Sequence, residues 1–459
     1  MLAEELYMKE HAGRVLHTTW NPGTRDVLRL HLIFPRYVWG KRPPALVIIN
    51  GKEYLPLARA QAILLAEAID AVNAHGPVSE EERESGRGGQ GLTEILQEAL
   101  TRVRRFYPRR SIEQLAADLE IILGTVEDIN RGRAVAIELG GLSLRDIAPY
   151  MTAPHRMDLM VSAMTKEGHW NCNQRCVHCY AAGQEMGQTR ERSTEDWVRI
   201  IDRCYQAGIP QLTFTGGEPT MREDLPLLIG HARWFISRLN TNGIRLTEDY
   251  CQKLVLAELD HVQVTFYAAD RRVHNRLVGG DHYDQTVRGI ENALAAGLGI
   301  STNTPLCSLN ADYIDTLRFL HEMGVRFVTV SGLIVTGNAR GEASKASTLR
   351  RQELSRILWE ACDFAYAHDM DLNFTSPGLA DSETLRALGL DEPACGAGLS
   401  NMAVAPNGDV VPCQSWLSDR PLGNLLTDPW EKIWRDPKTR RIRRQSAGNL
   451  LCCPLSQRG

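Results

Sequence analysis

Several features that mark whole classes of protein are missing from this sequence. No run of apolar residues approaches the roughly 20 that a membrane-spanning helix needs, and the polar N-terminus "MLAEELYMKEHAGR" lacks the apolar core of a signal peptide. The sequence also has no large excess of positive or negative residues, because it contains 52 basic and 56 acidic residues and its formal net charge is -4. This balance gives no electrostatic footprint for nucleic acid or an anionic membrane. We therefore expect a cytoplasmic protein that binds neither.

Cysteine is missing from the N-terminal part of the chain and grouped in the rest. None of the eleven cysteines precedes Cys172; one group lies at 172–179 and a second at 395–453. In a reducing cytoplasm, grouped cysteines favour metal or redox chemistry over structural disulfides. The other four stand singly in periodic apolar segments, where we expect buried core residues: Cys204, Cys251, Cys307 and Cys362.

Residues 1–150 predict a small domain in which strands precede helices. The segments "ALVIIN" and "KEYLPL" flank Asn50 and Gly51, which favour a tight hairpin because both turn positions need positive φ. Apolar residues recur at helical spacing at about 58–74, 92–106 and 111–130. Between the first two helices, the charged and glycine-rich stretch "GPVSEEERESGRGGQG" predicts a mobile loop.

From about residue 157 the pattern changes to short apolar strands that alternate with amphipathic helices. Six strands are predicted, with the sequences "MDLMVSAM", "QLTFT", "FISRLNTN", "HVQVTFYA", "GISTNTP" and "RFVTVSGLIV". In the helix "STEDWVRIIDRCYQAG", Ser193 can cap the N-terminus. Successive strand-helix units imply a parallel sheet, open or closed into part of a barrel, with its chemistry at the carboxyl ends of the strands. We assign residues 151–345 to this domain and 346–459 to a C-terminal one.

Three cysteines in the stretch "HWNCNQRCVHCYAAG" follow the pattern C-x3-C-x2-C, at Cys172, Cys176 and Cys179. A zinc site or a closed four-cysteine cluster takes four protein ligands, and a thioredoxin-like motif uses two cysteines. Three thiolates in one loop can hold three corners of a [4Fe-4S] cluster and leave the fourth iron open to a non-protein ligand. A zinc site completed by His169 or His178 is the alternative.

A second motif ends the strand "QLTFT" with Gly216, Gly217, Glu218 and Pro219. Paired glycines let a ligand approach the backbone closely, and a carboxylate at a strand end can accept hydrogen bonds from an ammonium group. Glycine-rich turns follow many strands, so this motif alone is weak evidence for a ligand site. It becomes informative because it lies one strand-helix unit after the cysteine loop.

Together these motifs resemble the radical S-adenosylmethionine enzymes, and the likeness extends over residues 157–340 through "LNTNG", "VQVTFYAAD", "STNTPLCSLN" and "GLIVTGNAR". The resemblance implies an α/β fold, a partial (β/α)6 TIM-like barrel. It also implies an enzyme that cleaves S-adenosylmethionine reductively at a [4Fe-4S] cluster. The products would be methionine and a 5'-deoxyadenosyl radical, which abstracts a hydrogen atom from the substrate.

The resemblance also implies roles for particular residues. Cys172, Cys176 and Cys179 would be cluster ligands, and Gly216, Gly217 and Glu218 would meet the methionine amino group. His178 would lie near the adenine. Three strand-end residues hold positions that often touch the ribose or carboxylate, although a structural role is equally open for each: Thr241, Thr265 and Asn303. Where relatives often carry serine and aspartate, this chain has Thr265 and Tyr267.

The second cysteine group lies in the C-terminal domain. The segment "PNGDVVPC" predicts a hairpin with Asn407 and Gly408 in its turn, which would bring Cys413 to Cys395. The domain resembles the cysteine-rich tail called twitch, a shortened SPASM domain, and so implies one auxiliary iron-sulfur cluster. Adjacent cysteines point in different directions, so ligation by Cys452, Cys453 or both stays open. Zinc is the alternative here as well.

The order of elements in residues 1–150 resembles the winged-helix peptide-recognition element of maturases of ribosomally made peptides. There a leader segment of the precursor adds a strand to a sheet edge. The alternative is a packing or dimerisation domain.

We therefore expect a radical maturase that introduces a thioether, a carbon-carbon crosslink or an epimerised residue. Its partners would be a precursor peptide with a leader segment and a reducing protein such as flavodoxin or ferredoxin. Radical oxidation or rearrangement of a small molecule or a protein residue is one alternative, and a non-enzymatic iron-sulfur winged-helix regulator is another. The sequence singles out no residue that donates or accepts hydrogen.

Overall fold

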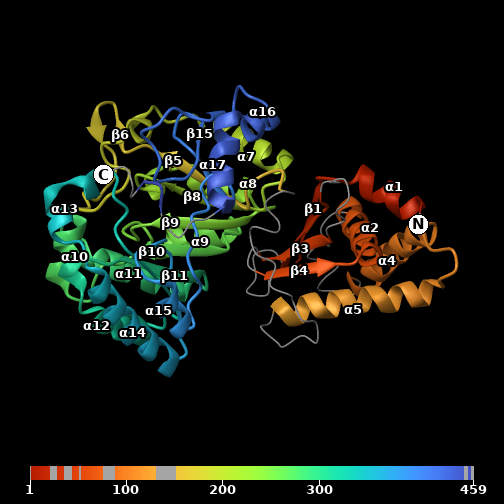
Figure 1. Ribbon diagram of the computed structural model, residues 1–459, viewed down its shortest axis with the longest axis horizontal. Helices are drawn as coiled ribbons and strands as arrows, with labels where there is room; N and C mark the ends of the chain where they lie inside the picture. The colour runs from red at the N-terminus through yellow and green to blue at the C-terminus, as the bar shows by residue number, and fades with distance from the viewer. Residues whose placement is uncertain are drawn as a thin grey trace. The chain divides into compact units, whose positions relative to one another are not determined.

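A computed structural model of the chain describes residues 2–20, 28–35, 44–50, 53–75, 88–130, 151–448 and 453–455. The chain forms two compact units, Met1–Ala153 and Pro154–Gly459 (Figure 1). No helix in the described ranges is long and apolar enough to cross a membrane.

The first unit is a four-stranded antiparallel sheet with helices packed on it. Its strands pair in chain order: β1 (Val15–Trp20), β2 (Leu28–Ile33), β3 (Ala45–Ile49) and β4 (Glu53–Leu57). Its helices are α1 (Leu2–Glu10), α2 (Arg59–His75), α4 (Gly88–Arg104) and α5 (Ile112–Asn130). The predicted β3–β4 hairpin is confirmed, with Asn50 at a φ of 48°, while Gly51 lies outside the described residues. The sequence did not predict α1 or β1.

The three predicted helices are present, but the glycine-rich loop between the first two is only partly testable. Residues 76–87 lie outside the described residues, whereas α4 already begins at Gly88. The expectation of a loop is therefore wrong for residues 88–91. Helix propensity is a weak prior that tertiary packing overrides, and α4 packs along α2.

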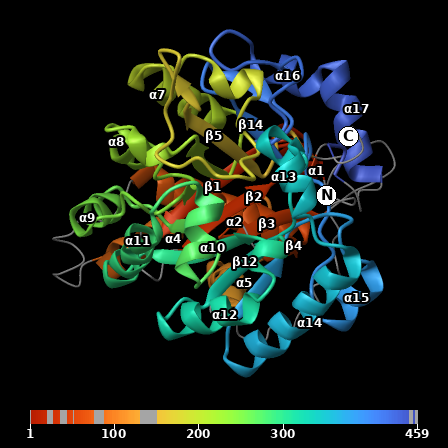
Figure 2. The same ribbon diagram turned by 90° about the vertical axis from the view of Figure 1, so that its left-hand side faces the viewer.

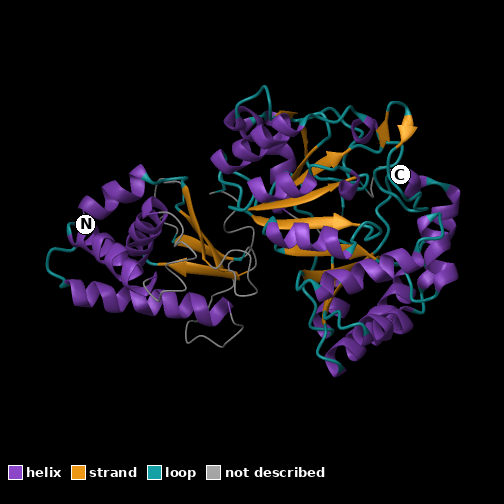
Figure 3. Ribbon diagram, turned by 180° about the vertical axis from the view of Figure 1, so that it is seen from behind, coloured by secondary structure: helices purple, strands orange, loops and turns teal. Residues whose placement is uncertain are grey.

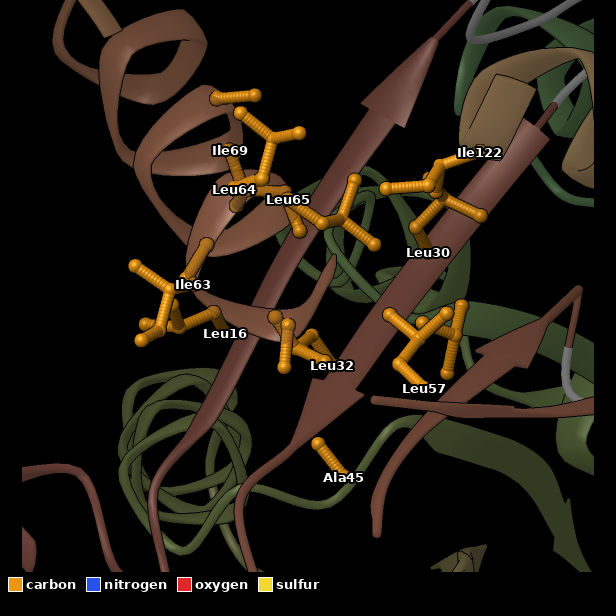
Figure 4. Packing of buried hydrophobic residues seen from close by; sticks show 14 of the residues in the cluster. Leu16, Leu30, Leu32, Ala45, Leu57, Ile63, Leu64, Leu65, Ile69 and Ile122 are labelled. Carbon is orange, nitrogen blue, oxygen red and sulfur yellow. The ribbon is translucent and has the colours of Figure 1, made fainter. Parts of the chain in front are cut away.

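The core of the first unit lies between its sheet and its helices (Figure 4). Leu30 and Leu32, two positions apart on β2, point to the same face and are fully buried. Ile63 and Leu65 of α2 and Ile122 of α5 pack into the same cluster. Burial of each such side chain is worth about 1.5–3 kcal/mol, which explains why the unit has its own compact core.

The second unit is built on one ten-stranded sheet (Figure 3). Seven neighbouring strands are parallel: β5 (Arg156–Ser162), β8 (Gln211–Gly216), β9 (Ile236–Thr241), β10 (His261–Thr265), β11 (Gly299–Pro305), β12 (Phe327–Ser331) and β13 (Asp371–Phe374). The first six are the predicted strands. Beyond β5 the sheet continues with β14 (Asn401–Val404), which is parallel to β5, and with antiparallel β15 (Asp409–Val411) and β16 (Gly423–Asn424). This α/β arrangement is consistent with a partial barrel.

Helices connect and flank the strands of this sheet (Figure 2). They are α7 (Thr194–Gln206), α8 (Leu225–His231), α9 (Glu248–Leu256), α10 (Arg271–Val278), α11 (Tyr283–Ala295), α12 (Tyr313–Glu322), α13 (Glu342–Ala346), α14 (Arg351–Ala367), α15 (Ser382–Ala387), α16 (Trp430–Arg435) and α17 (Pro437–Gly448). A small hairpin, β6 (Thr165–Lys166) and β7 (His169–Trp170), follows β5. The predicted cap of α7 is confirmed, because the Ser193 hydroxyl accepts a hydrogen bond from the Asp196 amide at 3.2 Å.

Three of the four single cysteines are buried as expected. Cys204, Cys251 and Cys307 are buried, but Cys362 is half-buried, so the expectation is wrong there. The buried stripe of α14 runs through Leu358, Ala361 and Ala365. Cys362 lies one position beside this stripe.

Candidate functional site

The loop with the first three cysteines lies between β7 and α7 and is held by backbone hydrogen bonds from distant segments. The amides of Arg175 and Val177 donate to carbonyls at the end of α10, at 3.0 and 2.9 Å. The Asn338 amide donates to the Cys179 carbonyl at 2.9 Å. Its neighbour Gly337 has a φ of +56°, and a Cβ there would stand 2.5 Å from the Cys179 carbonyl oxygen. The close contact therefore requires glycine.

The three thiols of this loop are close enough to influence one another. Burial raises the pKa of Cys172 to about 12, with further contributions from Glu218 and Cys179. Burial also raises the pKa of Cys176, and Cys179 and Cys172 raise it further. Burial likewise raises the pKa of Cys179. These three half-buried cysteines have raised pKa values, so a bound positive charge would be needed for all three to ionise. The donor set therefore fits an iron-sulfur cluster, whose ligands are thiolates.

In the zinc alternative, His169 or His178 would complete the site. Among the described residues, no three histidine, cysteine, aspartate or glutamate side chains are arranged to hold a single metal ion. His178 is buried, and its ring is directed to two serines: Nδ1 lies 2.8 Å from Ser344 Oγ and Nε2 lies 3.5 Å from Ser347 Oγ. Burial also lowers the pKa of His178, which favours the neutral form of the ring.

Glu218 is a buried carboxylate surrounded by hydrogen-bond donors. It is 2 % exposed. Its Oε1 accepts from the Thr220 amide at 3.1 Å, from the Thr220 hydroxyl at 2.6 Å and from the Thr241 hydroxyl at 2.6 Å. Its Oε2 accepts from the Asn242 amide at 2.8 Å.

No basic side chain pairs with Glu218 within the described ranges. Burial therefore raises the pKa of its carboxyl group, although the four hydrogen bonds oppose the shift. A buried carboxylate without a cation provides a site for a ligand ammonium group. The Asn242 side chain also donates to Asn173 at 2.6 Å, which links Glu218 to the cysteine loop.

The two glycines before Glu218 have a packing role. Gly216 has a φ of +149°, and a Cβ there would overlap Ser162 of β5. A Cβ on Gly217 would stand 2.9 Å from the Ala163 carbonyl oxygen. Both glycines are thus required by the close approach of β5, a reason that the sequence did not reveal.

The three strand-end residues that the sequence singled out lie in two different surroundings. Thr241 is buried and donates to Glu218, so its hydroxyl supports the carboxylate. Thr265 and Asn303 are half-buried and lie opposite each other in the register of β10 and β11. Tyr267 is buried in a small cluster, and Cys176 packs against that cluster. These residues all lie at the carboxyl ends of parallel strands, where chemistry was expected.

Two of the C-terminal cysteines, Cys395 and Cys413, flank a short hairpin. The hairpin of β14 and β15 is confirmed, with Gly408 in its turn at a φ of +88°. Burial raises the pKa of Cys413 well above its usual range, and Cys395 and Cys453 raise it further. Cys395 and Cys453 are thus near enough to Cys413 to affect its pKa, while Cys452 lies outside the described residues.

Each of the two cysteine groups lies in a region that matches a known protein family. Residues 171–320 match the model of the radical SAM superfamily, and residues 395–454 match SPASM, an iron-sulfur cluster-binding domain. Residues 171–320 thus form a radical SAM domain, and residues 395–454 form a SPASM domain. A protein of this kind carries a [4Fe-4S] cluster, an auxiliary cluster and bound S-adenosylmethionine.

Curated relatives of this chain include a maturase and a peptide cyclase. Mycofactocin maturase MftC of Mycolicibacterium smegmatis is 27% identical over 297 residues, 63% of this chain and 74% of the relative. PqqA peptide cyclase of Streptomyces rochei is 26% identical over 269 residues, 57% of this chain and 72% of the relative.

Solved structures show the same fold. Streptococcus suis SuiB bound to precursor peptide SuiA has a TM-score of 0.59 at 15% identity, and 87% of each chain is covered. The enzyme anSMEcpe with bound AdoMet has a TM-score of 0.51 at 16% identity, with 64% of this chain and 84% of the other covered.

The radical SAM loop and the SPASM domain are joined by hydrogen bonds that the sequence did not predict. The Tyr180 hydroxyl, next to Cys179, donates to Gln414 Oε1, next to Cys413, at 3.2 Å. The Gln184 amide group donates to the Ser415 carbonyl at 3.1 Å and accepts from the Leu417 amide at 3.1 Å. The two cysteine groups therefore belong to one packed body.

Proposed function

We propose that this radical SAM enzyme modifies a ribosomally made precursor peptide. The observation that carries the proposal is the likeness to SuiB, a protein solved with its precursor peptide SuiA. The match covers 87% of this chain, more than the second unit alone supplies, so it includes part of the first unit. The names of the curated relatives, a mycofactocin maturase and a peptide cyclase, point to the same class of substrate.

In this proposal Cys172, Cys176 and Cys179 hold the [4Fe-4S] cluster. When bound, the cluster and S-adenosylmethionine together supply the 5'-deoxyadenosyl radical. Glu218 accepts the methionine ammonium group, because it is a buried carboxylate without a cationic partner. Gly216 and Gly217 bring that carboxylate to the end of β8 by allowing β5 to approach.

The remaining cofactor contacts follow from position. His178 lies beside the adenine, with its ring oriented by Ser344. Thr265 and Asn303, neighbours at the ends of β10 and β11, face the ribose or the carboxylate of the same ligand. Thr241 contributes indirectly, by holding Glu218.

The auxiliary cluster is proposed to bind Cys395, Cys413 and Cys453, whose thiols influence one another. Cys452 is the candidate for a fourth ligand. In this proposal residues 1–150 recognise the peptide, residues 151–345 carry out the radical chemistry and residues 346–459 bind the auxiliary cluster.

Peptide recognition would use the sheet of the first unit, a winged-helix-like element. Its outer strands β1 and β4 each pair on one side only within the described residues. An added peptide strand would complete backbone hydrogen bonds at one of these edges. Pro56 of β4 lacks an N–H and weakens that edge as a donor.

The experiment is an anaerobic incubation of the reconstituted enzyme with S-adenosylmethionine, a reductant and candidate precursor peptides. Mass spectrometry should find 5'-deoxyadenosine together with a changed peptide mass. Hydrogen exchange should show that the leader protects amides of β1 or β4. If small molecules or leaderless proteins are modified equally well, the radical oxidation alternative replaces this proposal. If no nucleoside forms at all, the regulator alternative does.

A further inference from the structure

The last described helix, α17, concentrates positive charge in a chain that is slightly negative overall. Its twelve residues, "PKTRRIRRQSAG", include five basic residues and no acidic one, whereas the chain has a net charge of -4. Two of the five are occupied locally: the Arg443 guanidinium lies 4.0 Å from the Trp434 ring centroid, and Lys438 donates to the Arg420 carbonyl.

The other three basic residues of α17 face solvent. Arg440, Arg441 and Arg444 are exposed and have no ion pair within the described part of the chain. They line one hollow of about 370 Å³. The two acidic residues beside the helix accept hydrogen bonds from other groups: Asp436 from the Lys438 amide and Asp419 from the Trp416 indole. We call Arg440, Arg441 and Arg444 the basic face.

The inner side of α17 packs on the loop that follows Cys395. The Ser446 hydroxyl donates to the carbonyl of Ala397, two residues after Cys395, at 2.6 Å. Gly398 has a φ of +67°, and a Cβ there would stand 3.0 Å from Ile442. The helix therefore lies against the Cys395 loop.

A second path joins the same surface to Cys413. The Trp416 amide donates to the Cys413 carbonyl at 3.0 Å, and its indole is buried. Trp416 also lines a hollow of about 220 Å³ together with Lys438 and Arg441. From Cys413 the hydrogen-bonded pair Gln414 and Tyr180 continues to the first cysteine loop.

We propose that the basic face of α17 is the docking surface for an acidic one-electron carrier protein, which exchanges electrons with the iron-sulfur site of Cys395, Cys413 and Cys453. This inference rests on the proposed function, because it needs both clusters. In the exchange one electron leaves the reduced cofactor of the carrier and one electron enters the auxiliary site. No bond forms or breaks.

Position and charge favour this occupant. Electron transfer needs a short separation, and α17 touches the loop that carries Cys395. Transient redox complexes are small, and complementary charge steers their encounter. Three unpaired arginines on one helix face provide that charge, and they match an acidic partner. The alternative occupant of the basic face is an acidic segment of the precursor peptide. The experiment must distinguish this peptide from the electron carrier.

The experiment compares the enzyme with the triple variant Arg440→Glu, Arg441→Glu, Arg444→Glu, using a flavodoxin as the carrier. Binding of oxidised flavodoxin is measured by calorimetry, and 5'-deoxyadenosine formation is measured with reduced flavodoxin and with dithionite. Since exposed charge pairs are individually weak but add in a patch, we expect roughly tenfold weaker binding and a matching rise in the KM for flavodoxin. The dithionite-driven rate should stay within about twofold.

A matched control reverses three exposed arginines at the opposite edge of the sheet: Arg318→Glu, Arg326→Glu and Arg356→Glu. It should bind flavodoxin as the parent does. If the acidic triple variant is unstable, Arg440→Gln, Arg441→Gln, Arg444→Gln should weaken binding in the same direction.

Three results separate the proposals. Equal flavodoxin binding by parent and variant overturns the docking surface. A higher KM for the peptide under dithionite also overturns it and assigns the basic face to the peptide. Absence of 5'-deoxyadenosine in the parent with dithionite refutes the proposed function, while the flavodoxin titration still tests the surface.

Discussion

Replacing Glu218 with glutamine tests the proposed S-adenosylmethionine site by exchanging one carboxylate oxygen for an amide nitrogen. Glutamine keeps the volume and leaves an oxygen for the three donors that face Oε1. Its new amide group would meet the Asn242 N–H, which now donates to Oε2 at 2.8 Å, so one charge-assisted hydrogen bond is replaced by two opposed donors. The negative charge that we assign to the methionine ammonium group is lost as well. Removing one partner of a buried, hydrogen-bonded charge pair costs about 2–5 kcal/mol.

At about 1.4 kcal/mol per tenfold change, this loss corresponds to S-adenosylmethionine binding that is roughly 30-fold to 4,000-fold weaker. Equilibrium binding to the reconstituted enzyme, measured anaerobically with radiolabelled ligand, gives the affinity directly. Asp260→Asn is the matched control, because Asp260 accepts from the Ser237 amide at 2.7 Å at the amino-terminal end of the sheet. That variant should bind as the parent does. Binding of Glu218→Gln within threefold of the parent would refute the assigned role of this carboxylate.

Four further predictions follow from the two sites. Reconstituted protein should contain about eight irons per chain, as two four-iron clusters. If metal and sulfide analysis finds zinc with negligible sulfide, both iron-sulfur assignments are wrong. Cys176→Ala should abolish 5'-deoxyadenosine formation and leave the auxiliary cluster visible by electron paramagnetic resonance; unchanged cleavage would contradict the ligand set. Deleting residues 1–150 should preserve cluster loading and the slow, substrate-independent cleavage of S-adenosylmethionine, but it should sharply lower peptide modification. Cys413→Ala should instead preserve leader binding and block product formation. Equal modification of full-length peptide by the folded truncation would exclude peptide docking on residues 1–150. Affinity for S-adenosylmethionine should fall as the pH falls through the raised pKa of free Glu218, because the ligand ammonium group binds the charged carboxylate and its binding releases a proton; a titration in which Glu218→Gln keeps the same pH dependence would contradict this.

Local patterns predicted most of the strands and the metal donors. Apolar runs bounded by turn residues identified β5 and β8 to β12, and Gly408 marked the β14–β15 turn. The spacing of Cys172, Cys176 and Cys179 indicated a cluster because ligand type and number are written in the sequence itself. Such features depend on residues that are neighbours in the chain.

The features that were missed depend on pairing between distant segments. The hairpin of β14 and β15 was predicted, but the parallel pairing of β14 with β5, which makes it part of this sheet, was not. The partners of Glu218 come from the adjacent strand end, at Thr241 and Asn242, and only the register of β8 and β9 brings them there. The glycines of the GGEP motif suggested ligand approach, whereas their packing against β5 became visible only in three dimensions.

The basic face of α17 shows the same limit. A run of arginines in the sequence "KTRRIRR" indicates a charged helix. It does not reveal that Ile442 and Ser446 of that helix contact the loop that carries Cys395. The position of the charge above a cysteine site is a property of the fold.

The central claim is that this enzyme abstracts hydrogen from a precursor peptide. Its most direct test uses a precursor in which the carbon-bound hydrogens are replaced by deuterium, incubated anaerobically with the reconstituted enzyme, unlabelled S-adenosylmethionine and dithionite. The account predicts 5'-deoxyadenosine that carries one deuterium, formed together with a peptide of changed mass. Unlabelled 5'-deoxyadenosine with an unaltered peptide, from every precursor encoded beside the gene, would contradict it.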